Sequence, residues 1–189
     1  LLKEEYENVR HLHLDLTSLY ELFINSLHPA VKLEHNPSAP LALANSKARI
    51  RMTTLYMISG THNGLVVGTG NKVEDFGVGF FTKYGDGGVD ISPIADLMKS
   101  DIYNLAKQLK VSKEILDAPP TDGLWEDGRS DEFQLNATYD ELEWAMLNED
   151  CEEELWSERQ EEVFEIYLDV RDKNLHKMSP IPIFKKEKK

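Results

Sequence analysis

The spacing of apolar and polar residues predicts a series of helices and strands along the chain. HLHLDLT at 11–17 alternates apolar and polar residues, which predicts a strand, and the following SLYELFINSLH predicts a short helix. The first residues, LLKEEYENV, resemble the end of a helix. A proline-bearing loop follows at 28–40, and Pro40 is placed to open the next helix.

That next helix is predicted over 41–60, because apolar residues recur there at helical spacing up to Gly60, a residue suited to a C-terminal cap. Lys47 and Arg51 lie one turn apart on one side of it, while Arg49 points elsewhere. Two explanations of these cations stay open: pairing with Asp or Glu in this acidic chain, and binding of an anion.

A strand and a turn are predicted over 64–71. GLVVGTGN reads as a buried strand of a parallel sheet that runs into a glycine-rich turn, and ligands of open α/β sheets bind at that end. The turn lacks the third glycine of the dinucleotide fingerprint, and the chain contains no Walker loop. Glu74 and Asp75 come just past the strand, where carboxylates are suited to Mg²⁺ beside phosphates.

The stretch FFTKYGDGGVD at 80–90 places three glycines within four positions. Glycines there cost backbone entropy, so the segment needs a tight turn or a close approach of the backbone to another group.

The C-terminal third predicts two helices. TYDELEWAML begins with a capping box, Thr138 with Glu141. The stretch 152–174 predicts a long amphipathic helix that places its apolar residues against the core or a partner; these are Trp156, Val163, Ile166, Leu168 and Val170. KKEKK at 185–189 is expected to be a disordered tail.

Composition limits the class of protein. With 189 residues, 41% of them hydrophobic, the chain can form one domain over 1–189. The net charge of −13 argues against broad nucleic-acid binding. No signal peptide or membrane span is predicted, so a cytoplasmic protein without membrane contact is expected. The single Cys151 excludes a disulfide framework within one chain. His11 and His13 share a strand face, but no third ligand lies nearby, so a polar strand face is favoured over a metal site.

Several motifs together resemble those of the ammonia-dependent NAD synthetases in order and spacing. They are NSKARIRM, VVGTGNKVED, GFFTKYGDGGVDISPIADLMKSDIY, APPTDGLWEDGRSDE, TYDELEWAM and HKMSPIPIF. The resemblance covers nearly the whole chain. It implies an α/β fold, a Rossmann-like parallel sheet flanked by helices of the adenine nucleotide alpha hydrolase type, and a homodimer.

The resemblance also implies a reaction. ATP adenylates the nicotinate carboxylate of deamido-NAD, which gives an NAD-adenylate and releases pyrophosphate, and ammonia then displaces AMP to leave NAD. Adenylation turns a poor acyl electrophile into one with a good leaving group. Two polyanions meet at this site, so cations and Mg²⁺ are expected to offset their repulsion. The resemblance assigns no catalytic residue in this chain.

Site residues are implied by the same resemblance. Contacts to deamido-NAD fall on Arg49, Lys83, Asp90, His176 and Lys177, and contacts to ATP fall on Thr69, Lys99 and Thr121. The family's metal-binding glutamate lies five positions after the threonine and eight before the lysine. Glu74 satisfies the first spacing and Asp75 the second, because one extra residue lies between them. We favour Glu74, with Asp75 as the alternative.

The family's pyrophosphate loop, Ser-Gly-Gly-x-Asp-Ser, has no counterpart in this sequence. We therefore expect the N-terminal part of the domain to lie outside the sequence, and this chain alone to be inactive. A non-catalytic fragment or dimerisation module of the same fold is the alternative. A second rival is another adenylating amidotransferase, such as the ATP-pyrophosphatase part of GMP synthetase, in which FFTKYGDGGVD has no place. No glutaminase domain is present, which implies free ammonia as the nitrogen donor.

Overall fold

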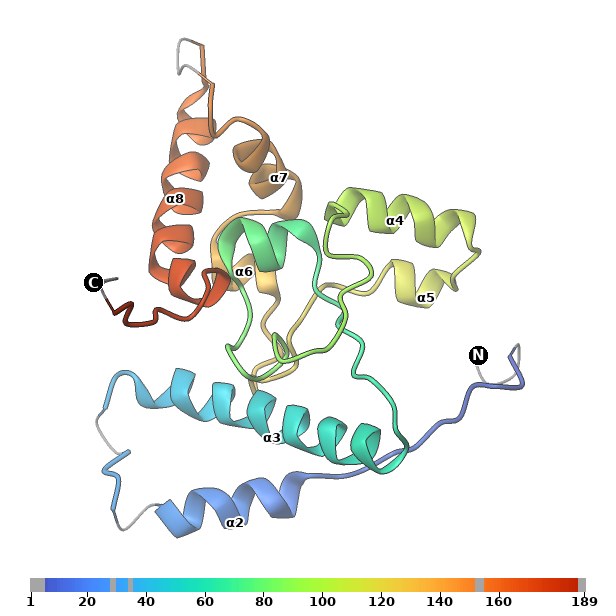
Figure 1. The fold of residues 1–189 in the computed structure, drawn as a ribbon. Coiled ribbons are helices and arrows are strands. Elements are labelled where there is room, and N and C mark those ends of the chain that lie inside the picture. Colours follow the sequence, from blue (N-terminus) through green and yellow to red (C-terminus); the bar gives the residue numbers. More distant parts are fainter. Residues whose placement is uncertain (1–5, 28–29, 34–35, 152–154, 187–189) are drawn as a thin grey trace. The chain divides into compact units, whose positions relative to one another are not determined.

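The structure is a computed structural model that describes residues 6–27, 30–33, 36–151 and 155–186. The chain divides into two compact units, Leu1–Leu43 and Ala44–Lys189. Figure 1 shows the helices of both units in sequence colours. Within the described residues, no helix is long and apolar enough to cross a membrane.

The first unit contains the helix α2, Thr17–Leu27, which confirms the helix predicted after residue 17. Its first amide is capped, because the Thr17 N–H donates to Asp15 Oδ1 at 2.9 Å. The strand predicted over 11–17 is wrong: residues 11–16 are irregular and mostly exposed, and Thr17 already belongs to α2. A strand needs a neighbouring edge for its backbone groups, which alternation alone does not supply. The helix end predicted at 1–9 falls partly on residues outside the described ranges.

A long helix, α3, spans Ala39–Thr61 and confirms the helix predicted over 41–60. The cap predicted at Gly60 is wrong, because Gly60 is helical and the left-handed residue past the helix end is Asn63, φ 51°. The second unit then continues with a π-helix and five α-helices: η1 Lys72–Val78, α4 Lys99–Gln108, α5 Lys113–Leu116, α6 Asp131–Leu135, α7 Tyr139–Leu147 and α8 Glu158–Met178. The π-helix was not predicted. Both C-terminal helices were, although α8 begins six residues later than the segment from which it was predicted.

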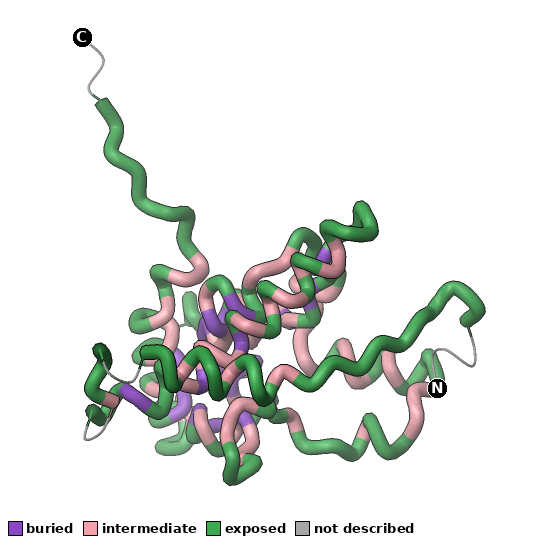
Figure 2. Tube along the Cα trace, turned by 90° about the horizontal axis from the view of Figure 1, so that it is seen from below, coloured by how far each residue is buried: buried purple, intermediate pink, exposed green. Residues whose placement is uncertain are grey.

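The core of the second unit is built where η1, α7 and α8 meet. Its buried residues are Val73, Val78, Leu135, Ala137, Tyr139, Leu142, Ala145, Val163 and Tyr167. Figure 2 shows them among the purple stretches of the chain. Trp156 precedes α8 and its ring lies 5.1 Å from that of Trp144 and 4.7 Å from that of Phe164, so it extends this core as the sequence predicted.

The strand predicted over 64–71 is reduced to a single parallel bridge between Val67 and Ile91 in the described residues. The Gly68 N–H donates to Ile91 O at 2.7 Å beside it. Three residues later Asn71 already caps η1, which ends the extended stretch. No strand longer than this single bridge is present in the described residues, so the parallel sheet of the expected fold stays a prediction.

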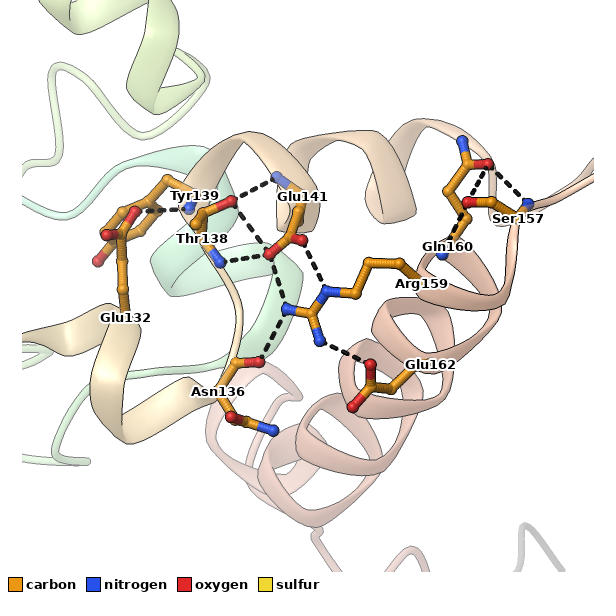
Figure 3. A network of polar contacts seen from close by, with 9 residues as sticks. All are labelled: Glu132, Asn136, Thr138, Tyr139, Glu141, Ser157, Arg159, Gln160 and Glu162. Carbon is orange, nitrogen blue, oxygen red and sulfur yellow. Dashed lines mark hydrogen bonds and ion pairs between the residues drawn. The ribbon is translucent and has the colours of Figure 1, made fainter.

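A polar network joins α7 to α8 (Figure 3). The predicted capping box is present: the Thr138 N–H donates to Glu141 Oε2 at 2.8 Å, and the Glu141 N–H donates back to Thr138 Oγ1. From α8, Arg159 Nε donates to Glu141 Oε1 at 2.8 Å and Nη2 donates to Asn136 O at 3.2 Å. One guanidinium thus fixes α8 against the start of α7.

Candidate active site

The π-helix η1 lies at the centre of the candidate site. Its cap is the buried Asn71, whose Oδ1 accepts from the Glu74 N–H at 3.0 Å. Glu74 and Asp75 occupy its first turn, and it ends at Gly79 in the left-handed region, φ 63°. Single π-turns recur at functional sites. Here the turn presents two neighbouring carboxylates to different surroundings.

Glu74 forms an ion pair with Lys99, the first residue of α4. The distance from Nζ to Oε1 is 2.6 Å, and the two side chains are 18% and 16% exposed. The Lys99 ammonium also lies 4.4 Å from the centre of the Tyr139 ring. The residue that we predict to bind the metal and one that we predict to bind ATP are therefore in direct contact.

Behind this ion pair lies a buried carboxyl that the sequence analysis missed. Tyr139 donates its hydroxyl hydrogen to Asp131 Oδ2 at 3.2 Å. Asp131 Oδ1 is buried and has no hydrogen-bond partner among the described residues. Burial raises the pKa of Asp131, and burial, with Glu74 and Asp131 nearby, raises the pKa of Tyr139. In the sequence, Asp131 looks like an ordinary charge at the start of a helix, so no local pattern indicated its contact with Tyr139.

Asp75 points to different neighbours. Burial, together with the charges of Glu74 and Asp86, raises the pKa of Asp75 to about 6. Gly70 makes room for this carboxylate, because a Cβ at residue 70 would lie 1.9 Å from Asp75 Oδ2. Asp75 lines a cavity of about 340 Å³ that Lys83 and Lys177 also line.

Of the residues that the family resemblance assigns to deamido-NAD, Lys83 and Lys177 line this cavity, and Arg49 and His176 are joined to Lys83 by hydrogen bonds. Arg49 Nε donates to the main-chain oxygen of Lys83 at 3.2 Å. Lys83 Nζ in turn donates to His176 O at 2.6 Å. Lys177 Nζ donates to Gly79 O at 3.0 Å and to Phe81 O at 2.8 Å, and burial lowers its pKa. The structure thus brings four of the five predicted residues together.

Asp90, the fifth, is engaged elsewhere. Its Oδ1 accepts from the Tyr56 hydroxyl at 3.1 Å and its Oδ2 accepts from the Val66 N–H at 2.8 Å. In this structure its carboxylate holds the segment before residue 90 beside the Val66 backbone. Its predicted contact with the dinucleotide stays a prediction.

Among the described residues, no hydrogen bond joins Lys99 to the other two residues predicted to bind ATP. Thr69 is exposed in the turn that follows the bridge. Thr121 Oγ1 donates to Arg129 O at 3.2 Å and accepts from the Gly123 N–H at 3.2 Å, so it shapes its own loop. Lys47 Nζ and Arg51 Nη2 reach that loop from α3, donating to Leu124 O at 3.0 Å and Gly123 O at 3.1 Å. The sequence left two kinds of partner open for Lys47 and Arg51, acidic side chains and an anion. In the structure both also donate to main-chain carbonyls.

The glycines of FFTKYGDGGVD allow a close approach within the protein. A Cβ on Gly85 would lie 2.9 Å from Ala48 Cβ, and a Cβ on Gly88 would lie 3.0 Å from Met52 Cγ, both on α3. A Cβ on Gly87 would lie 2.3 Å from the Phe81 ring. The turn therefore fits against α3 while Lys83 stays at the cavity.

Comparison with known proteins places this chain in a family. The NAD synthase family model matches residues 5–181. The NH(3)-dependent NAD(+) synthetase of Carboxydothermus hydrogenoformans is 40% identical over 148 residues, which cover 78% of this chain and 59% of that protein. The enzyme of the same name from Mycoplasma genitalium is 38% identical over 166 residues, 88% of this chain and 61% of that protein.

Solved structures agree with this. The NMN synthetase of Francisella tularensis has a TM-score of 0.76 and 32% identity, over 93% of this chain and 67% of that one. The NH3-dependent NAD synthetase of Campylobacter jejuni has a TM-score of 0.66 and 26% identity, over 91% of this chain and 64% of that one. The match covers 59% and 61% of the two curated relatives named above. On the family match and these identities, the chain belongs to the NAD synthase family.

Proposed function

We propose that the complete protein containing this chain amidates deamido-NAD to NAD, with ATP as co-substrate and ammonia as nitrogen donor. The proposed route is the formation of an NAD-adenylate with release of pyrophosphate, followed by attack of ammonia with release of AMP. Family membership supports the reaction. The observation that carries it is the single segment 74–83, which links the Glu74–Lys99 ion pair to the cavity at Lys83.

The two ends of this segment suit two substrates. At one end, Lys99 supplies a cation whose present partner is a carboxylate, so a phosphate can take over the same contact. At the other end, the ammonium groups of Lys83 and Lys177 and the guanidinium of Arg49 lie around main-chain oxygens. Cations at both ends offset the repulsion between two polyanions, which must meet before the carboxylate can attack a phosphate of ATP.

Magnesium fits the chemistry of Glu74. Mg²⁺ prefers oxygen ligands and is usually held by one or two carboxylates together with substrate phosphates and water. Glu74 would supply one such carboxylate, already placed beside a residue that we propose to bind ATP. When bound, Mg²⁺ would neutralise phosphate charge during adenylation.

An amidation assay of the complete protein tests the proposal. NAD formation is measured with deamido-NAD, ATP, Mg²⁺ and either ammonium or glutamine. We expect NAD with ammonium and little with glutamine. Efficient use of glutamine would refute ammonia dependence, and the absence of NAD with either donor would favour a non-catalytic member of the fold.

A mononucleotide substrate is the second candidate, because one structural neighbour is named an NMN synthetase. The same assay with nicotinate mononucleotide in place of deamido-NAD separates the two. We expect a higher kcat/KM for the dinucleotide, since the sequence resembles the dinucleotide enzymes. From the same resemblance we also propose that the complete protein is a homodimer in the cytoplasm. Sedimentation tests the dimer, and cell fractionation tests the location.

A further inference from the structure

Three side chains of α8 donate hydrogen bonds to the main-chain carbonyls that follow Asp75, those of residues 76–79 and of residue 81. Arg171 Nη1 donates to Phe76 O at 2.5 Å and to Gly77 O at 2.7 Å. Asn174 Nδ2 donates to Val78 O at 3.0 Å. Lys177 Nζ continues the series on Gly79 O and Phe81 O. We call Arg171, Asn174 and Lys177 the α8 ladder; spaced three residues apart, they lie on one face of the helix.

The end of η1 needs these donors. The last carbonyls of a helix have no partner within it, and Gly77, Val78 and Gly79 are buried from water. Glu74 O accepts from the N–H groups of Gly79 and Phe80, which closes the last turn of the π-helix. The carbonyls beyond it are satisfied from α8 instead, so the path of the chain after Glu74 depends on that helix.

The fit between the two segments is close. Gly79 has φ 63°, and a Cβ there would lie 2.7 Å from Asn174 Cβ. Arg171 is itself oriented, because its Nε lies 3.7 Å from Glu149 Oε1 and its guanidinium lies 6.0 Å from the centre of the Tyr167 ring. The oriented guanidinium of Arg171 and the close contact at Gly79 therefore leave η1 little freedom to shift along α8.

We propose that Arg171 and Asn174 are positioning residues of the amidation reaction. They fix the segment 74–83 so that Glu74 faces Lys99 while Lys83 faces the cavity. Neither touches the groups assigned to substrate. This inference rests on the proposed function, in which Glu74 serves the ATP side and Lys83 the dinucleotide side. One ladder on α8 then sets the distance between the two substrates.

Asn174→Asp tests the ladder, because the carboxylate keeps the shape of the amide and loses its donor. Asn174→Leu repeats the loss of the donor without a new charge. Two controls are matched to them. Lys173→Ala lies on the same helix, where Lys173 pairs with Asp169 and is 69% exposed. Val163→Ala cuts into the core at a fully buried α8 residue away from the ladder, so it reports the effect of lost stability alone.

Two readouts in the complete protein decide the matter. We expect amide hydrogen exchange of a peptide covering 72–82 to speed up by roughly tenfold in both Asn174 variants and in neither control, at a temperature where all stay folded. We expect kcat to fall roughly tenfold to a hundredfold, as for misplaced reacting groups, with the Kd of each substrate changed less.

Asn174 variants that behave like Val163→Ala in three respects would refute the ladder. These are the same melting temperature, the same hydrogen exchange at 72–82 and the same kcat. Hydrogen exchange does not require turnover. A wild-type protein that makes no NAD, with faster exchange at 72–82 in the Asn174 variants, would therefore refute the proposed function and the positioning role together, while leaving the ladder as a structural clamp.

Discussion

The ammonium of Lys99 lies 2.6 Å from the carboxylate of Glu74, and both side chains are more than four-fifths buried. Each group offsets the charge of the other, which lets η1 and the start of α4 approach closely. If ATP and Mg²⁺ bind here, phosphate takes over Lys99 and the metal takes over Glu74. Substrate binding would then replace the partners of Lys99 and Glu74, two charged groups that are already largely shielded from water.

The first prediction separates Glu74 from Asp75. In the complete protein, Glu74→Gln should raise the Mg²⁺ concentration for half-maximal NAD formation and slow adenylation, because the amide is a weaker ligand for Mg²⁺ than a carboxylate. Asp75→Asn should change both much less. The measurement is pyrophosphate release against Mg²⁺ concentration; the opposite ranking of the two variants would move the proposed metal site to Asp75.

The second prediction concerns the Glu141–Arg159 contact in Figure 3. Arg159 lowers the pKa of Glu141 from its ordinary 4.5 to about 2, so the ionised form is favoured on folding. The resulting stability is present above pH 4.5 and is lost as the pH falls toward 2. Glu141→Gln should therefore lower the free energy of unfolding at pH 7 by about 1 kcal/mol.

Urea unfolding of wild type and Glu141→Gln at pH 7 and at pH 3 measures this loss. The difference between the two proteins should shrink at the lower pH. A difference that is equal at both pH values would contradict an ionic origin.

The third prediction uses two glycines as a matched pair. Gly79→Ala should destabilise the protein by about 1 to 3 kcal/mol, because alanine is strained at positive φ and its Cβ would meet Asn174. Gly60→Ala, near the end of α3 with no atom within 4 Å of the added Cβ, should be neutral or stabilising. Thermal unfolding compares them; equal melting temperatures would mean that η1 adjusts freely against α8.

Local signals explain which elements could be predicted from sequence. Helix α7 was predictable because Thr138 and Glu141 cap it with their own side chains. Helix α8 was predictable from its apolar spacing, and Ser157 with Gln160 forms a capping box at its start. The strand at 11–17 was mispredicted because a strand is stabilised by a neighbouring strand, on which alternation carries no information.

The site divides in the same way. Glu74, Lys83 and Lys99 were predicted as site residues from motif spacing, which follows the order of residues in the chain, and these roles stay predictions. The Asp131–Tyr139 pair and the α8 ladder were not found, because both depend on contacts between elements: α6 with α7 in one case, and η1 with α8 across more than ninety residues of sequence in the other. No spacing within one element indicates such contacts.

The most direct test of the two-ended site is calorimetric titration of the complete protein with each substrate separately. Lys83→Ala removes a cation from the cavity and should weaken deamido-NAD binding by about 1.5 to 3 kcal/mol, the range for a charge-assisted contact. ATP binding should change little, since Lys99 and Glu74 remain, and circular dichroism checks that the variant is folded. Intact deamido-NAD binding with lost ATP binding would contradict the account, because the cavity at Lys83 would then belong to ATP.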